Sequence, residues 1–446
     1  MAAEMTVTRE KLAEYLAAPD KFDCGIAIFH ADVITMSPGT VNGYFCPPPQ
    51  VRLFGDGWKK LFDDAENASK LTSDQLSEQP TSSSANHPLD LSSEKKQAAE
   101  NMLYVTGCAE NDLLSLKVNM YRPAKRNPES FLSKQMKVVA EPSSRIRSGS
   151  TVAIFNKSET AGTRYLHVSS DGPHLIPSHD NWSPLVIYHV TKPNPRQRQD
   201  PVKLKSGDIY HGSFVKLVDR ITGVVLPDVR IMKVLEHGVI PLDELNSRNH
   251  PVCQLQNYAL QMIQDSKSYM SIHDDVIGTY TSALLTVQKM DQITDAEEWT
   301  IMSTDEAKFR FYEAMGPVSG PVTPVPTIID IKMKKTVKSD RTPITLVEFI
   351  GSNFRNEHQI WCGLHELRQY VESPERITCF HPTHQEVSNP PGSEMFREVS
   401  GEVGFPITIT RSDGVIYGTP YYFVYNINNG SSRLEKIDPL TEFTNS

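Results

Sequence analysis

Short apolar runs, several with apolar and polar residues in alternation, recur along most of the chain. Examples are "GIAIFHADV" (25–33), "STVAIFN" (150–156), "LVIYHV" (185–190) and "FVKLVD" (214–219). Runs of this length, bounded by Gly, Pro, Asn and Asp, predict β-strands and turns. Because no helical patterns of 10–15 residues separate them, we predict an all-β protein made of sandwiches or barrels.

One segment near the N-terminus follows a helical period instead. In "TREKLAEYL" (8–16), Leu12, Tyr15 and Leu16 fall on one face, and Thr8 is suited to cap the first turn. The segment predicts a short amphipathic helix before the first strand.

Three stretches interrupt the strand pattern. Residues 65–100 are Ser-rich and almost free of aromatic residues, which predicts a disordered insertion. "GPVSGPVTPVP" (316–326) alternates small residues with proline and predicts a stiff strap between domains. The prolines of "FCPPP" (45–49) cannot donate to a sheet, so we expect them at an edge or in a polyproline II link.

The pattern also separates the later parts of the chain. Some ten short strand candidates in roughly 151–315 suit a barrel or trefoil. After the strap, alternating strands with an Asp-Gly turn at 413–414 predict an immunoglobulin-like sandwich.

Composition narrows the functional classes. The net charge is −9, and no apolar run approaches the roughly 20 residues of a membrane helix. The six cysteines are scattered, and no phosphate loop, nucleophile elbow or HExxH motif occurs. Cys379, His381 and His384 lie close together but lack a second ligand pair, and His167 fits a strand position. We therefore expect no enzymatic activity, no cofactor, no bound metal, no membrane partner and a monomeric protein.

Several longer motifs resemble one family, the CSL transcription factors of the Suppressor of Hairless and RBP-J type. They occur in the family's order over about residues 5–425: "TREKLAEYL", "YFCPPPQVRLFGDGWKK", "FLSKQMKVVAEPS", "TRYLHV", "VKLVDRITGVVLP", "HPVCQL", "GPVSGPVTPVP" and "ITRSDGVIYGTPYYFVY". The resemblance implies a Rel-homology-like N-terminal domain (1–150), a central β-trefoil (151–325) and a C-terminal immunoglobulin-like IPT/TIG domain (326–430). It also implies a nuclear location, double-stranded DNA as partner, a Notch-type peptide, and co-activators or co-repressors.

The candidate DNA contacts carried over from the family have lost charge. Asn42 and Gly43 stand where the family has a basic pair, and Gln135 stands where it has a base-reading arginine, although Lys134 and Lys137 are retained. Arg145 and Arg147 form the remaining basic loop. The family's basic run after its next strand is replaced by "GCAENDLL" (107–114), and a trefoil loop shrinks to "KSETAG" (157–162).

These changes remove groups that read guanine or neutralise phosphate. Arginine forks onto guanine O6 and N7, which glycine and glutamine do not reproduce, and each such pair contributes about 1–3 kcal/mol of discrimination. Residues 1–150 hold 17 Lys and Arg against 19 Asp and Glu, whereas a domain that grips DNA is usually positive. The sequence therefore predicts weak DNA binding.

The resemblance also implies an apolar groove on the trefoil for a Trp-containing Notch segment. The corresponding positions are Val202, Leu204 and Val225, with Lys216 in "VKLV" and Thr279 later in the chain. For the alternating residues 202 and 204, a place in the trefoil core is an equally natural interpretation.

Two hypotheses follow. The first is a sequence-specific DNA-binding transcription regulator and nuclear effector of Notch-type signalling, with an eroded base-reading surface. The second is a DNA-binding-deficient relative with the same fold that acts as a scaffold for protein interactions. A salt-dependent DNA titration discriminates between them.

Overall fold

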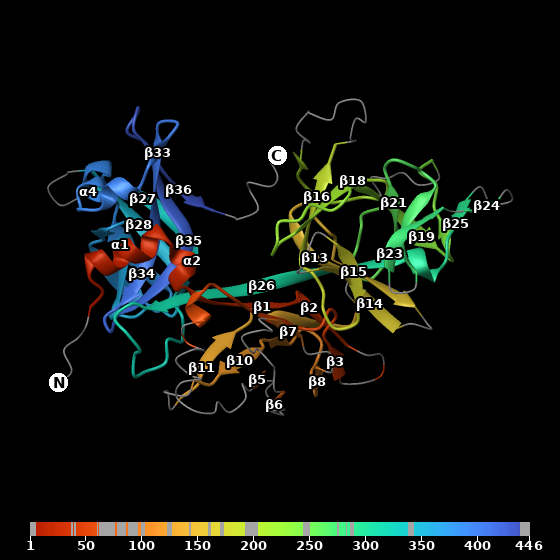
Figure 1. Ribbon diagram of the computed structural model, residues 1–446, viewed down its shortest axis with the longest axis horizontal. Coiled ribbons are helices and arrows are strands. Elements are labelled where there is room, and N and C mark those ends of the chain that lie inside the picture. Colours follow the sequence, from red (N-terminus) through yellow and green to blue (C-terminus); the bar gives the residue numbers. More distant parts are fainter. Residues whose placement is uncertain are drawn as a thin grey trace.

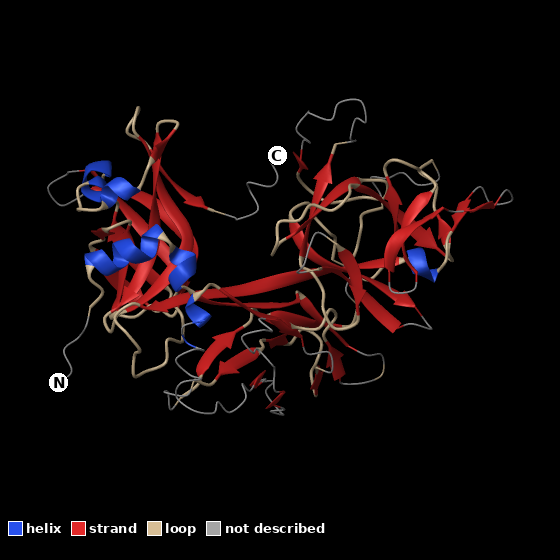
Figure 2. Cartoon of the chain, viewed as in Figure 1, coloured by secondary structure: helices blue, strands red, loops and turns tan. Residues whose placement is uncertain are grey.

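Strands dominate the computed structural model, as the sequence pattern predicts (Figures 1 and 2). The structure describes residues 6–36, 39, 42–59, 61, 76–77, 86–87, 97–99, 103–122, 127–141, 144–158, 162–169, 174–191, 204–243, 250–273, 276–281, 283–285, 290–337 and 343–437. The described strands and helices form an N-terminal, a central and a C-terminal unit.

The N-terminal unit contains short helices and two main sheets. Its elements are α1 (Arg9–Ala17), α2 (Pro19–Phe22), β1 (Cys24–Ala31), β2 (Val33–Met36), β3 (Asn42–Tyr44), β4 (Gln50–Phe54), β5 (Leu76–Ser77), β6 (Asn86–His87), β7 (Gln97–Ala99), β8 (Tyr104–Thr106), β9 (Leu113–Leu114), β10 (Lys117–Met120), β11 (Glu129–Leu132) and β12 (Met136–Val139). Strands β8-β3-β2-β12-β9 form a five-stranded sheet, and β1 pairs with β4.

The predicted helix is confirmed, with Thr8 as its cap. The Thr8 side chain accepts a hydrogen bond from the Lys11 backbone N–H, and Leu12 and Tyr15 are buried. These two side chains pack against Trp361 and Ile416 of the C-terminal unit, so α1 joins the two ends of the described chain.

Most of the predicted disordered insertion, residues 65–100, lies outside the described residues. Within it the structure describes β5, which pairs with β6, and β7, which pairs with β4. The last part of the stretch therefore belongs to a sheet, because Gln97–Ala99 adds a strand to the edge of β4.

The central unit is built from short antiparallel strands around its own apolar core. Its elements are β13 (Ser150–Ser158), β14 (Gly162–Val168), β15 (Leu175–Ser178), β16 (Leu185–Val190), β17 (Leu204–Lys205), β18 (Phe214–Asp219), β19 (Val229–Leu235), β20 (Gly238–Val239), β21 (Asn257–Met262), β22 (Ser268–His273), β23 (Val276–Thr281), β24 (Ala283–Leu285), β25 (Met290–Gln292) and the 3-10 helix η2 (Asp295–Glu297). Alternate residues point inward, including Val215 and Leu217 of β18, and Trp299 closes the core.

The triple proline forms part of the contact between the N-terminal and central units. Pro47, Pro48 and Pro49 are buried, and the indole N–H of Trp182 donates to the Pro48 carbonyl at 2.8 Å. Trp182 also packs edge-on against Phe29 of β1. The prolines are therefore a buried part of the scaffold that presents a carbonyl to the central unit.

One strand runs through all three units. β26 (Trp299–Glu313) pairs with β13 near its start, with β1 along its length, and with β35 at its end. Figure 1 shows it as the long strand that connects the central unit with the C-terminal one. Because a single strand carries these ladders, the positions of the three units depend on one another.

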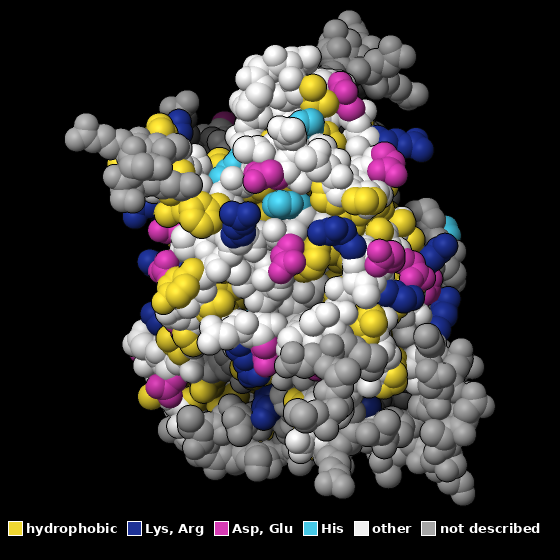
Figure 3. All heavy atoms as spheres, turned by 90° about the vertical axis from the view of Figure 1, so that its left-hand side faces the viewer, with side chains coloured by type: hydrophobic (Ala, Val, Ile, Leu, Met, Phe, Trp, Pro, Cys, Tyr) yellow, Lys and Arg dark blue, Asp and Glu magenta, His cyan; other side chains and the backbone are white. Residues whose placement is uncertain are grey.

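The C-terminal unit is a sandwich of antiparallel strands. Its elements are β27 (Thr327–Val337), β28 (Pro343–Ser352), β29 (His358–Cys362), β30 (His365–Glu366), β31 (Gln369–Ser373), β32 (Arg376–Phe380), α4 (His384–Ser388), η3 (Ser393–Met395), β33 (Glu398–Val399), β34 (Glu402–Arg411), β35 (Val415–Asn426) and β36 (Ser432–Lys436). The Asp-Gly turn joins β34 to β35, and Gly414 takes the positive φ of 96° that this turn requires. On the face shown in Figure 3, hydrophobic, basic and acidic side chains are mixed.

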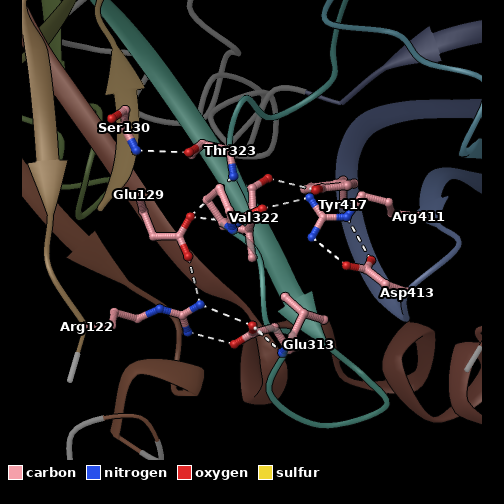
Figure 4. A network of polar contacts seen from close by, with 11 residues as sticks. Arg122, Glu129, Ser130, Glu313, Val322, Thr323, Arg411, Asp413 and Tyr417 are labelled. Carbon is pink, nitrogen blue, oxygen red and sulfur yellow. Dashed lines mark hydrogen bonds and ion pairs between the residues drawn. The ribbon is translucent and has the colours of Figure 1, made fainter. Parts of the chain in front are cut away.

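A buried polar network fixes the strap that follows β26 (Figure 4). Arg122 donates to Glu313 at 2.7 and 3.1 Å and to Glu129 at 2.9 Å. The other oxygen of Glu129 accepts the backbone N–H groups of Val322 and Thr323. The strap is thus held from the N-terminal unit through its own backbone.

The C-terminal unit holds the same strap from the opposite side. Arg411 donates to the Pro321 carbonyl at 2.9 Å and pairs with Asp413, and the Tyr417 hydroxyl donates to the Val322 carbonyl at 2.7 Å. Proline supplies stiffness, but these side chains supply the partners that give the strap one position.

Candidate nucleic-acid and peptide interfaces

The outward face of the five-stranded sheet in the N-terminal unit carries two of the predicted DNA-binding residues. Asn42 lies on β3 opposite Thr106, and the exposed Lys137 lies on β12. Tyr44 and Tyr104 are 43% and 52% exposed and stack with their ring centroids 6.2 Å apart. The face therefore offers aromatic and amide groups with little positive charge.

Gly43 faces the opposite side of that sheet. A Cβ atom at this position would lie 2.6 Å from Ile34 Cγ2 and 3.1 Å from Cys108 Sγ, inside the apolar core of the sheet. Of the predicted pair, only Asn42 reaches the surface. The prediction of Gly43 as a DNA contact fails because strand neighbours point to opposite faces.

Lys134 and Gln135 lie exposed in the turn between β11 and β12. The Lys134 ammonium is paired with Asp305 of β26 at 2.6 Å. Burial raises the pKa of the nearby Asp32 to about 6, and Gln254 donates to the Asp32 carboxylate at 3.2 Å. A phosphate that approached Lys134 would therefore also meet acidic groups.

Arg145 and Arg147 share one carboxylate. The guanidinium groups lie 3.1 and 3.5 Å from the two oxygens of Asp208, and the arginine side chains are 60% and 70% exposed. The sequence gives no sign of this pairing, because Asp208 follows more than sixty residues later. Within the described ranges, Lys137 is the only one of the four predicted cations without an ion pair.

Three predicted peptide-binding residues share the outward face of β16 and β18. Leu204 is the cross-strand partner of Val190, Lys216 of Tyr188, and Val225 of Val218. Leu204 and Val225 are 41% and 42% exposed, so they are surface residues and the core interpretation of Leu204 is wrong. Val202 lies outside the described residues.

Thr279 does not join these residues through the sheet. It lies exposed on β23 opposite Met270, and β19, β21 and β22 separate β23 from β18 along the ladder. Sequence reasoning also missed Phe214, which shares its face of β18 with Lys216. The alternation in "FVKLVD" was the available signal for it.

The Cys379, His381 and His384 cluster has structural partners. Cys379 is buried in the sandwich core, and burial raises the pKa of its thiol to about 12. His381 bonds to Ser432 and His384 to Ser388. In the described part of the chain no group of three metal-binding side chains comes together, and no helix there has the length and apolar character needed to cross a membrane.

Comparison with protein families gives three matches in succession. Residues 26–150 match the model described as "LAG1, DNA binding", residues 171–299 the "Beta-trefoil DNA-binding domain", and residues 325–425 the "TIG domain". The predicted fold class is confirmed, because these models follow the predicted order on an all-β chain.

Comparison with individual proteins gives relatives over most of the chain. The "Recombining binding protein suppressor of hairless-like protein" of Mus musculus is 27% identical over 426 residues, which cover 89% of this chain and 79% of the relative. The protein of the same name in Homo sapiens is 26% identical, with 90% and 79% covered. "Transcription factor cbf11" of Schizosaccharomyces pombe is 21% identical, with 76% and 60% covered.

Proposed function

Because the chain belongs to the CSL family of transcription factors, we propose that it is a nuclear DNA-binding transcription regulator with weak discrimination between DNA sequences. Its N-terminal and trefoil units would lie on duplex DNA, and its trefoil would receive a Notch-type peptide. The observation that carries the proposal is the pairing of candidate DNA-binding cations with carboxylates of the same surface.

Specific binding needs side chains that read base edges. Gln135 replaces an arginine of the family pattern, and a side chain at the position of Gly43 would face the core of the sheet. A bidentate arginine–guanine contact contributes about 1–3 kcal/mol of discrimination, so the loss of the contact at position 135 removes part of the roughly 4–10 kcal/mol that separates specific from non-specific binding.

Phosphate contacts are weakened rather than removed. Lys134, Arg145 and Arg147 are exposed, and exposed ion pairs contribute only about 0–1 kcal/mol. DNA phosphates can therefore replace Asp305 and Asp208 as partners at low salt. This exchange of partners supports a protein that still binds DNA but makes few contacts to the DNA phosphates.

The peptide part of the proposal rests on the apolar residues that face outward from β16 and β18. Val225 and Leu204 flank a surface to which Phe214 and Tyr188 also contribute, and Lys216 lies between them. Aromatic anchors of a partner usually bind to such apolar patches with a polar rim. A Trp-bearing extended peptide fits this chemistry.

A salt titration of DNA binding tests the proposal. The full chain would be titrated with a family-type G-rich duplex and a scrambled duplex between about 50 and 200 mM salt. We expect the two affinities to differ by less than about tenfold. Both should fall only gradually as salt rises, with a slope that corresponds to roughly two to three phosphate contacts.

Either of two results would contradict this expectation. Nanomolar binding with clear preference for the G-rich duplex would show that base reading is intact. Undetectable binding to both duplexes at the lowest salt would favour the second hypothesis, a scaffold that no longer binds DNA.

A further inference from the structure

A small cavity lies on the outer wall of the trefoil unit, close to the residues assigned to the peptide. Its volume is about 240 Å³, and its lining includes Arg230, Met232, Val239, Gln261, Tyr269 and Asp291. Met232, Val239 and Tyr269 are buried, and Arg230, Gln261 and Asp291 add polar groups to the lining. This space is sufficient for one side chain of a partner.

The strand register places the cavity on the same face as Leu204. Successive cross-strand partners lead from Leu204 to Val190, Phe214, Arg230, Gln261 and Tyr269. Directly paired residues of antiparallel strands point to the same face. Two contacts follow this row: the Arg230 guanidinium lies 4.2 Å from the centre of the Phe214 ring, and the Gln261 amide donates to the Tyr269 hydroxyl at 3.2 Å.

Arg230 supplies the unused hydrogen-bonding capacity of the cavity. Its buried Nε–H has no hydrogen-bond partner among the described residues. The other polar groups are engaged: Tyr269 donates to Asp291 at 2.8 Å, and Gln261 donates to the Ser266 carbonyl. A ligand that enters the cavity must therefore bring acceptors.

The charge of Asp291 decides which acceptor fits. A carboxylate carries one negative charge and matches the fork of an arginine. A phosphate carries up to two charges and would be repelled more strongly by the Asp291 carboxylate. The cavity thus favours the side chain of Asp or Glu over a phosphorylated group.

We infer that the Arg230 cavity receives an acidic side chain of the same extended peptide whose apolar anchor contacts Leu204 and Val225. This inference rests on the peptide part of the proposed function. Three strand spacings of about 4.8 Å separate β17 from β19, and an extended chain rises about 3.3 Å per residue. The acidic residue therefore lies about four residues from the apolar anchor.

Calorimetry with paired peptides tests the inference on the full chain. Each peptide carries one Trp, with a single Glu placed three, four or five residues to either side, and each has a partner peptide with Gln in place of that Glu. We expect one Glu peptide to bind about tenfold more tightly than its Gln partner, because a charge-assisted pair replaces a neutral one. In Arg230→Gln this difference should disappear, whereas Arg355→Gln, an exposed arginine of the C-terminal unit, should retain it.

The possible failures are distinct. If every Glu peptide binds like its Gln partner, the cavity is not an acidic subsite, and the peptide part of the proposed function stands. If no peptide binds, that part of the proposed function is wrong and the inference is wrong with it. Because the Glu-to-Gln change is in the peptide, misfolding of a variant does not enter the wild-type result.

Discussion

The candidate DNA surface and the strap use the same kinds of ion pair in opposite surroundings. Lys134 and Asp305 are 56% and 41% exposed, whereas Glu129 and Glu313 beside Arg122 are 1% and 7% exposed. Water and salt screen the first pair, so its partners are exchangeable. The second group is shielded and hydrogen-bonded to backbone, so it fixes a segment. Burial therefore decides whether such an ion pair can exchange its partners or holds a segment in place.

The largest effect is expected on stability, when the buried cation of this comparison is removed. Arg122→Met leaves two buried carboxylates facing each other, and breaking a buried pair in this way costs about 3–5 kcal/mol of unfolding free energy. Chemical denaturation of the variant and the wild type measures this loss.

The matched exposed change is Arg433→Met, which removes the exposed pair of Arg433 with Glu402. It should cost less than about 1 kcal/mol. Equal losses in the two variants would mean that burial does not separate the two kinds of ion pair.

Base reading should be partly recoverable at the exposed position. Gln135→Arg adds an arginine in an exposed turn, so we expect preference for the G-rich over the scrambled duplex to rise by about 1–3 kcal/mol. Gly43→Arg should instead destabilise the sheet core, because its side chain begins against Ile34. Competition binding measures the first effect and thermal unfolding the second. A gain in preference from Gly43→Arg alone would contradict the inward placement.

The acidity of the candidate DNA surface should make binding pH-dependent. Burial raises the pKa of Asp32 to about 6, so Asp32 loses its charge as the pH falls from about 7.5 to 5.5. DNA affinity should rise several-fold over this range. Since the folded state holds this proton more tightly than the unfolded chain, stability from this group also rises as the pH falls through 6 and is lost as the pH rises.

Asp32→Asn removes the titrating group but keeps its size. In this variant the pH dependence of DNA affinity should be clearly flatter. An identical pH profile in the variant and the wild type would show that Asp32 does not act on the DNA surface.

Sequence patterns were sufficient for the all-β class and for individual elements. Period-two alternation identified the strand "FVKLVD", and the spacing of Leu12 and Tyr15 together with the Thr8 cap identified α1. These features depend on neighbours within a few residues, which the sequence displays directly.

The candidate sites depend on residues that are distant in the sequence. No residue near Arg145 indicates that it pairs with Asp208, and nothing in "FLSKQMKV" indicates that Lys134 pairs with Asp305. Likewise, β3 is too short for alternation to tell which of Asn42 and Gly43 faces outward; the pairing with β2 and β8 decides it. The family pattern supplied the positions, and only the tertiary structure supplied their partners.

The most direct test of the account is the salt dependence of DNA binding by Asp208→Asn. If Asp208 occupies Arg145 and Arg147, its neutralisation should strengthen binding several-fold at low salt and steepen the salt slope by about one to two, at roughly 0.9 per phosphate contact. Glu402→Gln removes the same charge beside Arg433 in the C-terminal unit and should change neither quantity. Unchanged affinity and slope in Asp208→Asn would contradict the claim that the surface's own carboxylates occupy its candidate DNA-binding cations.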